Sequence, residues 1–315
     1  THYLRGYHGV GQVTEKLPSN KLFKGTIHTS SFQEENMSKD SSTVILTSKR
    51  PGLFGSPFTV YNRIRNHRRL VKHLIFRDMK VTYHGTLIGW GWTMVEPLAL
   101  TAVYWLVFSL LRGQDNPIFV LEILLGVLIY GMFSRTLSRT TTSVVGNSGL
   151  IKQVAIPREV FVWSIGGFQS LRFLLSLLIL PPLLILWQIQ LSWTLLLIPL
   201  LIIGVQALAI GLGMLFAILH VHIRDISHVV SILTTAGFFL SGVFFGMKHI
   251  DQSYHDVFAL NPVAVYIELG RALTTGNFDI LETSYVIQAV GFSFVSLLIG
   301  CIVFVRHEAQ AIKLL

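Results

Sequence analysis

Hydrophobic residues occur along this chain in long, nearly uninterrupted runs, separated by short polar segments. Six runs are long enough to cross a bilayer, since about 20 helical residues span about 30 Å of hydrocarbon. The alternating pattern of a membrane barrel is absent, and isolated strands leave backbone groups unpaired in lipid. The sequence therefore predicts an all-α polytopic membrane protein with six transmembrane helices, at 87–111, 118–138, 160–187, 194–219, 228–247 and 284–305.

The segment before the first run has a different pattern. Residues 59–84 place apolar side chains at helical spacing among Arg and Lys, which predicts a basic amphipathic helix lying in the membrane interface, with Arg77, Asp78 and Lys80 on its polar side. Residues 1–58 are polar and rich in Ser, Thr and charge, so we expect a partly disordered cytoplasmic arm. Residues 85–315 then form the membrane domain. No cleavable signal peptide is expected before the first run.

Positive charge is distributed unevenly between the two sides of this topology. Of 25 Lys and Arg, 21 fall in the segments that share a side with both termini, and three fall on the other side. The positive-inside rule places both termini in the cytoplasm, which predicts a multi-pass protein of the cytoplasmic (inner) membrane.

Composition supports a membrane protein and argues against several other classes of protein. The chain is 51% hydrophobic and 13% charged, with a mean hydropathy of +0.59, whereas soluble domains carry about 25% charged residues. The net charge of +9 faces anionic lipid headgroups or an acidic partner, so nucleic-acid binding is not needed to explain it. The single cysteine, Cys301, permits no disulfide framework and no cysteine-type metal site.

Glu96 and Arg172 are charged residues that lie well inside predicted spans. Glu96 and Arg172 both fall in the cytoplasmic half of their spans, and such groups face the protein interior or a water-filled route rather than lipid. They either pair with each other or bond separately to backbone and water. Pro181 and Pro182 predict a bend in the outer part of the third span.

The segment between the last two runs, residues 248–283, is not simply polar. Within it, residues 258–273 are amphipathic, and Asn261-Pro262 predicts a helix start, because proline is favoured at the first helical position. This helix is too short to cross the membrane and too apolar to lie in water. It is either re-entrant or interfacial.

Motifs for bond chemistry are missing from the sequence. No phosphate-binding loop GxxxxGK[ST] and no Asp-x-Asp pair is present, which disfavours an ATPase or a metal-dependent glycan transferase. In HVHIRD, His220 and His222 point to different faces of a helix, so we expect no metal there. The default for this segment is a short turn, and the alternative is a docking site formed by His222, Arg224 and Asp225.

Three segments around the spans carry a resemblance. RDMKVTYHGTLIGWGWTMVEPL, NSGLIKQVAIPREV and LNPVAVYIELGRAL, in this order, resemble the membrane subunit of ABC-2 type exporters, in the branch that exports polysaccharides such as O-antigen, teichoic acid and capsule. The resemblance covers about residues 60–310. It implies a homodimeric permease that moves a lipid-linked glycan, with ATP and Mg held by two copies of a separate ATPase chain and no cofactor in this one. An exporter of a drug or lipid, and an integral-membrane glycan transferase, stay as alternatives.

The resemblance also implies roles for particular residues. The first cytoplasmic loop is expected to dock the ATPase, and it is short, stiffened by proline and continuous with the third span; its candidates are Asn147, Leu150, Ile151, Lys152, Ile156, Pro157, Arg158 and Glu159. Aromatic side chains are expected to guide sugars through a channel, alongside Glu96 and Arg172: Tyr104, Trp105, Phe108, Phe238, Phe239, Phe244 and Phe245. An external gate is expected from Asn261, Pro262, Glu268 and Arg271.

Overall fold

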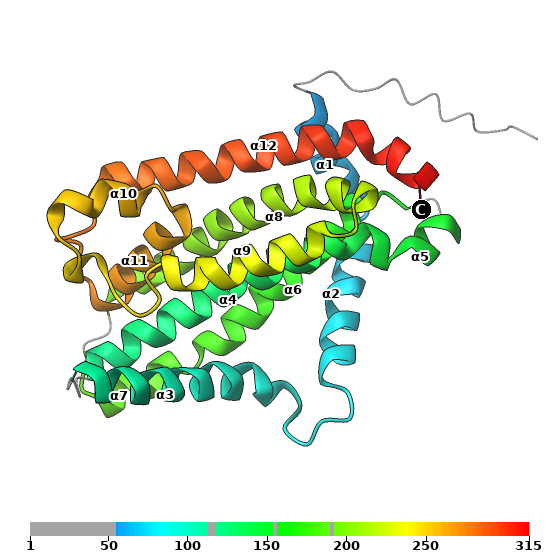
Figure 1. The fold of residues 1–315 in the computed structure, drawn as a ribbon. Helices are drawn as coiled ribbons and strands as arrows, with labels where there is room; N and C mark the ends of the chain where they lie inside the picture. Colours follow the sequence, from blue (N-terminus) through cyan, green and yellow to red (C-terminus); the bar gives the residue numbers. More distant parts are fainter. Residues whose placement is uncertain (1–54, 113–116, 154–155, 190–191, 315) are drawn as a thin grey trace, which may run out of the picture. The chain divides into compact units, whose positions relative to one another are not determined.

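The computed structural model describes residues 55–112, 117–153, 156–189 and 192–314, and all regular secondary structure within these ranges is helical (Figure 1). The chain divides into two units, and the second, Lys49–Leu315, contains every described residue. The predicted arm therefore lies largely outside the described residues. The helices of the second unit are α1 Gly55–Asn66, α2 Arg68–Tyr83, α3 Trp92–Arg112, α4 Pro117–Gly146, α5 Ser148–Gln153, α6 Glu159–Leu177, α7 Leu180–Leu186, α8 Ile198–His222, α9 Ile226–Leu240, α10 His255–Ala259, α11 Pro262–Thr275 and α12 Thr283–Leu314.

Five helical stretches of the described chain are long and apolar enough to cross a membrane. They are Gly89–Leu110, Ile118–Gly146, Glu159–Leu186, Trp193–His222 and Thr283–Glu308. The fifth span of the prediction, 228–247, is shorter than expected, because α9 has 15 residues and rises only about 22 Å. The predicted count of six spans is therefore not confirmed. Helix α9 ends at Leu240, and Gly242 follows with a left-handed φ of 69°, which does not continue an α-helix.

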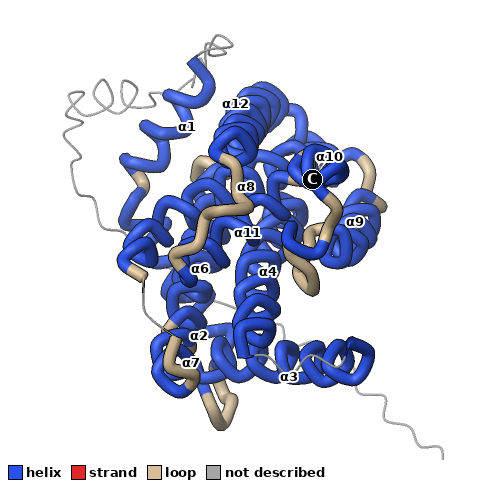
Figure 2. The backbone as a smooth tube through the Cα atoms, turned by 90° about the vertical axis from the view of Figure 1, so that its left-hand side faces the viewer, coloured by secondary structure: helices blue, strands red, loops and turns tan. Residues whose placement is uncertain are grey.

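Helix α8 lies at the centre of the bundle, packed between α4 and α12 (Figures 1 and 2). The approach of α8 to α12 is close because two glycines face each other. A Cβ on Gly211 would lie 2.4 Å from the carbonyl carbon of Ser296, and one on Gly300 would lie 2.4 Å from the Gly211 oxygen. Small residues at such a crossing let helix backbones approach in membranes, where apolar side chains gain little from leaving lipid.

The amphipathic segment before the first span forms two helices rather than one. The predicted helix 59–84 is interrupted at His67, between α1 and α2. Its apolar stripe is buried against protein: Val60 packs in one hydrophobic cluster with α6 and α12, and Leu74 and Met79 are covered as well. The amphipathic pattern is therefore confirmed, while its position in the membrane interface stays a prediction.

Two helix boundaries follow the proline positions. Helix α6 ends at Leu177 and α7 begins at Leu180, immediately before Pro181 and Pro182, so the helix is interrupted where the third span was predicted to bend. Helix α11 begins at Pro262, and the side chain of Asn261 caps it by accepting a 3.1 Å hydrogen bond from the Val263 amide.

Helix α11 is inserted between α4, α8 and α12. Its Tyr266 is 1% exposed and lies 2.8 Å from the hydroxyl oxygen of Ser293. Ser293 lies ten residues after the start of α12 at Thr283, which is about 15 Å along the helix axis. Of the two sequence alternatives, this depth favours a re-entrant helix, since non-spanning backbone at membrane depth requires protein around it.

Candidate functional site

Three charged residues from three helices meet inside the bundle. Arg172 on α6 donates a hydrogen bond from Nη2 to Oε2 of Glu96 on α3, and Arg135 on α4 places Nη1 3.5 Å from Glu96 Oε1. The pairing of Glu96 with Arg172, one of the two sequence alternatives, is confirmed. Packing between α3 and α6 supports it, because Ser176 on α6 donates a 2.6 Å hydrogen bond to the carbonyl of Thr93 on α3.

Arg135 is the member that sequence reasoning missed. Arg135 lies near the end of the second predicted run and was counted with the cytoplasmic Lys and Arg residues, whereas α4 continues to Gly146. The signal was available, because Arg135 lies inside the predicted run 118–138 and a charge within a span indicates a function. Tyr83, at the end of α2, also faces this group, and burial raises the pKa of its hydroxyl.

A groove begins beside these charges. It is a cavity of about 390 Å³ between α3, α4 and α9, lined by Leu100, Tyr104, Val127, Tyr130, Gly131, Ser134, Arg135, Thr234, Thr235, Phe238 and Phe239. The lining combines aromatic rings with hydroxyl groups. The aromatic ring of Tyr104 lies 5.6 Å from that of Phe238, and the ring of Phe238 lies 5.6 Å from that of Phe239.

Most of the aromatic residues proposed from the sequence meet at this groove. Tyr104, Phe238 and Phe239 line it, and Phe108 and Phe244 stack on each other at 4.9 Å in the adjoining cluster. The remaining two belong neither to the groove lining nor to this cluster. Trp105 packs against the main hydrophobic core, and Phe245 contacts Phe258 at 6.0 Å.

Both exceptions have a physical reason. Trp105 directly follows Tyr104 on α3, so it points to a different face of that helix. Phe245 lies beyond the end of α9 and the left-handed Gly242, so it does not continue the aromatic face of that helix. Tyr130 was missed because it lies within an apolar run; its hydroxyl donates to the carbonyl of Thr234 across α4 and α9 at 2.5 Å.

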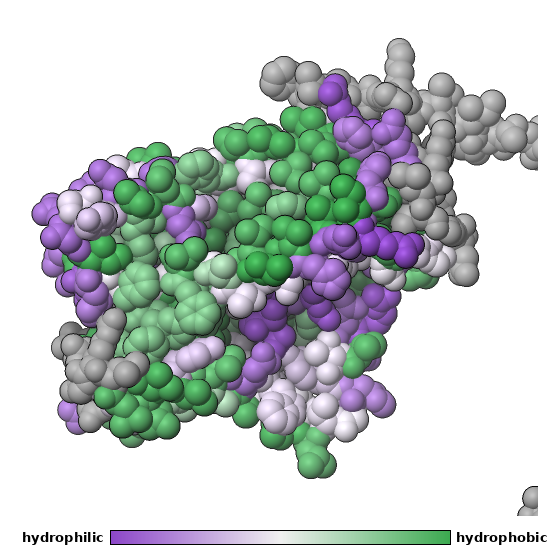
Figure 3. All heavy atoms as spheres, in the orientation of Figure 1, coloured by the Kyte–Doolittle hydropathy of each residue, from purple (hydrophilic) through white to green (hydrophobic). Residues whose placement is uncertain are grey.

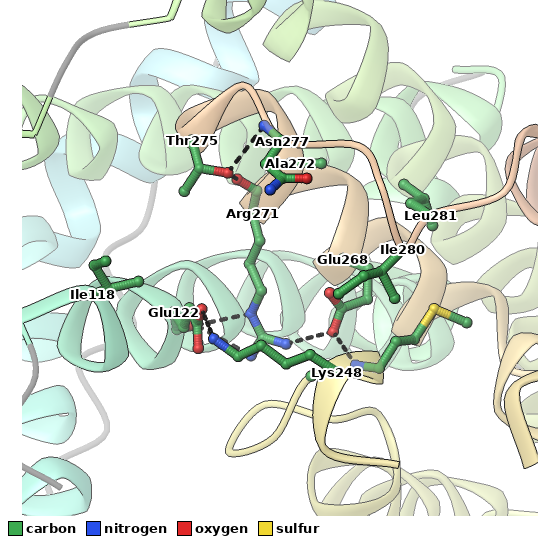
Figure 4. A pocket seen from close by; sticks show the side chains of 12 residues that line it. Ile118, Glu122, Lys248, Glu268, Arg271, Ala272, Thr275, Asn277, Ile280 and Leu281 are labelled. Carbon is green, nitrogen blue, oxygen red and sulfur yellow. Dashed lines mark hydrogen bonds and ion pairs between the residues drawn. The ribbon is translucent and has the colours of Figure 1, made fainter. Parts of the chain in front are cut away.

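The end of the bundle that carries α10 and α11, here called the α11 end, is tied together by Arg271. Its buried guanidinium donates to the carbonyls of Glu122, Gly242, Val243 and Phe245. Figure 4 shows its hydrogen bonds to Glu122 and to the carboxylate of Glu268. Glu268 also accepts from the amide of Met247 at 3.0 Å. One arginine therefore joins α4, α11 and the chain after α9.

A cavity of about 270 Å³ lies at the α11 end, and Figure 4 shows side chains that line it. Asn261 caps α11 at Pro262, and Glu268 and Arg271 pair on the same helix, while their role as an external gate stays a prediction. The ion pair between Glu122 and Lys248 at the rim was not anticipated, because Glu122 lies within the second apolar run.

The opposite end, where α4 ends, α5 lies and α6 begins, is here called the α5 end. Two residues of the predicted docking segment have buried side chains at this end. Ile151 is 7% exposed and packs in a hydrophobic core cluster, and Glu159 is fully buried, 2.6 Å from Arg63 on α1. The first completes the core and the second pairs with the partly buried Arg63, and a role for either in contacting a partner stays a prediction.

The buried ion cluster around Glu159 joins three helices. Arg63 also lies 3.1 Å from Glu308 on α12, which in turn lies 3.7 Å from Arg158. Burial opposes the charge on Arg63, but the carboxylates of Glu159 and Glu308 outweigh it and raise its pKa. This cluster fixes α1 to the start of α6 and the end of α12.

Other residues of the docking segment remain accessible. Leu150 is 40% exposed, whereas Ile156 and Pro157 are partly buried. The side-chain amide of Asn147 donates a 2.7 Å hydrogen bond to the carbonyl of Ser143. Asn147 also lines a cavity of about 190 Å³ with Arg77 and Asp78 of α2. The side chain of Lys152 lies outside the described residues.

The remaining predicted residues lie close to this end. Arg77 and Asp78 form an exposed ion pair at 2.8 Å, and Lys80 is exposed. His222, Arg224 and Asp225 are exposed at the turn between α8 and α9, and His222 Nδ1 lies 2.9 Å from the carbonyl of Ile218. Among the described residues, no three His, Cys, Asp or Glu side chains are grouped to hold a metal ion.

Comparison with known proteins finds relatives of this chain that are named as transport proteins. The chain is 24% identical over 241 residues to the O-antigen export system permease protein RfbA of Klebsiella pneumoniae, covering 76% of this chain and 92% of the relative. It is 28% identical over 205 residues to RfbA of Myxococcus xanthus, covering 62% and 76% of the two chains. The polysialic acid transport protein KpsM of Escherichia coli is 22% identical over 255 residues, covering 76% and 94%.

The described helices, with five stretches that can cross a membrane, make this an integral membrane protein. The family of ABC-2 type transporters matches residues 69–274, which include α2 through α11 and hence the charged trio, the groove and the α11 end. The chain therefore belongs to the ABC-2 type transporter family.

Proposed function

We propose that this chain is the permease subunit of an ATP-driven exporter that moves a lipid-linked polysaccharide across the cytoplasmic membrane. The observation that carries the proposal is the groove between α3, α4 and α9, whose lining combines aromatic rings with hydroxyl groups. Within this lining, the ring of Phe238 contacts the rings of both Tyr104 and Tyr130. The relatives named as O-antigen and polysialic acid transporters support the same substrate class.

The chemistry of the groove suits sugars. Aromatic rings pack on the C–H faces of sugar rings, and the hydroxyls of Ser134, Thr234 and Thr235 are small polar groups beside them. Along most of its length the groove carries no charge, and Arg135 is the single charged residue of its lining. A long neutral chain would therefore slide along it instead of binding tightly at one point.

The α5 end is proposed to face the cytoplasm and dock the ATPase. Both termini and most of the Lys and Arg residues belong to this side by the positive-inside rule. The exposed Leu150, together with the cavity shared by Asn147, Arg77 and Asp78, offers an apolar contact beside polar ones. Two copies of this chain would form one channel, and two ATPase chains would hold ATP and Mg.

Deletion of the gene in its source organism tests the proposal. The lipid-linked glycan should then accumulate on the cytoplasmic side of the membrane, and expression of the intact chain should return it to the cell surface. Normal surface glycan in the deletion strain, without intracellular accumulation, would count against polysaccharide export.

A further inference from the structure

The groove ends at a guanidinium with unused hydrogen-bonding capacity. Arg135 lies 3.5 Å from Glu96, a long contact, and its buried Nε has no hydrogen-bond partner among the described residues. Its side chain is 34% exposed, on the groove side. Arg172 differs, because it is 13% exposed and already holds Glu96 by a short hydrogen bond.

The charge balance at this point favours an anion. Glu96 is the one carboxylate shared by the guanidiniums of Arg135 and Arg172, which leaves the trio with one excess positive charge. The nearest further charge on α4 is Arg139, which lies over the ring of Phe168 at 5.2 Å and adds to the positive potential. Charges inside a membrane bundle are costly unless they are paired, so an uncompensated one indicates a ligand.

Gly131 keeps the Arg135 guanidinium at the groove wall. A Cβ at Gly131 would lie 2.6 Å from Nη2 of Arg135, one helical turn further along α4. The glycine thus leaves room for the guanidinium to lie flat on its own helix, facing α3 and α9. In Figure 3, hydrophilic residues gather in the angle between α2 and α3, beside the hydrophobic surface of α3.

The shape beyond Arg135 indicates an amphipathic ligand. Leu100, Tyr104, Phe238 and Phe239 continue the groove away from the charge, and Phe239 is 59% exposed, so the groove opens along α9. Phosphate is the acidic group that membrane lipids carry, and a guanidinium binds it through two parallel hydrogen bonds. We propose that Arg135 binds the phosphate group of a lipid whose remaining part lies in the groove.

This assignment rests on the proposed function for its preferred source, the phosphate that joins an exported glycan to its lipid carrier. An ordinary anionic phospholipid carries the same chemistry. Binding measurements separate the two sources. The permease and its ATPase are placed in nanodiscs of neutral phosphatidylcholine, and a fluorescent polyprenyl diphosphate and a fluorescent phosphatidylglycerol are each titrated into them.

Two variants of the groove test the site. Arg135→Gln removes the excess charge but keeps the Glu96–Arg172 pair neutral, so the bundle should still assemble. Gly131→Ala keeps the charge and displaces the guanidinium. Arg306→Gln, at an exposed position on α12, is the matched control for loss of one positive charge.

We expect Arg135→Gln to weaken binding of the diphosphate lipid by about tenfold or more, with Gly131→Ala weakening it less and Arg306→Gln leaving it unchanged. Loss confined to phosphatidylglycerol would support the same site with bulk phospholipid as its source. Unchanged binding of both lipids in Arg135→Gln would overturn the assignment. If wild-type complex showed Arg135-dependent binding but exported no glycan, the proposed function would fail while the site stood.

Discussion

Arg172 and Glu96 lie 76 positions apart in the sequence and form a hydrogen-bonded ion pair that joins α6 to α3. The pair is not closed, since Arg135 of α4 approaches the other oxygen of the same carboxylate. One glutamate therefore holds three helices, and the two arginines are not equivalent partners.

This asymmetry predicts that removing the charge of Glu96 and removing that of Arg172 lower the stability of the protein by different amounts. Glu96→Gln leaves two guanidiniums without a carboxylate and should destabilise the protein by about 2 kcal/mol, less than a fully buried pair because Glu96 is 43% exposed. Arg172→Gln leaves Glu96 with Arg135 and should cost about half as much. Thermal unfolding of the detergent-purified variants measures both.

The double variant Glu96→Gln/Arg172→Gln is the control for contact. Residues that interact directly give a double loss that differs from the sum of the single losses by about 0.5–3 kcal/mol. Additive losses would show that the two residues act independently.

The close crossing of α8 and α12 predicts opposite effects for two glycines. Gly211→Ala places a Cβ 2.4 Å from backbone of α12, so the helices must separate, at a cost of about 1–3 kcal/mol. Gly291→Ala, in α12 with no atom within 4 Å of its added Cβ, should be neutral or stabilise the helix by up to about 1 kcal/mol. Equal unfolding temperatures for the two variants would disprove this account of the crossing.

Arg271 is expected to hold the α11 end together. Arg271→Ala removes the donor from four backbone carbonyls and from Glu268, and should destabilise this end by about 3 kcal/mol. Limited proteolysis should then cleave the segment between α9 and α11 faster. Lys248→Gln breaks an ion pair whose lysine is 42% exposed, and should cost less than about 1 kcal/mol. Similar proteolysis of the two variants would argue against a special role for Arg271.

The accessible part of the docking segment predicts a separation of folding from partner binding. Leu150→Asp changes an exposed side chain on α5, so the permease should stay folded while co-purification of the ATPase falls by about tenfold. Tyr254→Asp, at a 61% exposed position of the α11 end, should leave co-purification intact. Full retention of the ATPase by Leu150→Asp would place the docking surface elsewhere.

Local sequence signals predicted the parts of the fold that local chemistry controls. Asn261-Pro262 gave the start of α11, and Pro181-Pro182 marked the break after α6, because a cap and a proline act within one helical turn. The break at His67 carries no proline or glycine, so the two helices before the first span were expected as one.

Burial of individual charged and apolar residues could not be read in the same way. Glu159 belongs to a short polar connection in the sequence. In the structure it forms an ion pair with Arg63, which lies 96 positions earlier. Arg135 and Glu122 were hidden within an apolar run, where a single charge changes the mean hydropathy little. Their roles follow from which helices lie side by side, and that is a tertiary property.

Transport by the purified complex tests the central claim most directly. The chain and its partner ATPase would be reconstituted in liposomes that carry the lipid-linked glycan in their membrane, and glycan on the ATPase-distal face would be measured with a glycan-specific probe. We expect translocation that requires ATP and is lost when the ATPase is omitted. Hydrolysis of ATP without any transfer of glycan to the distal face, under conditions where a related O-antigen exporter transfers its own, would contradict the claim.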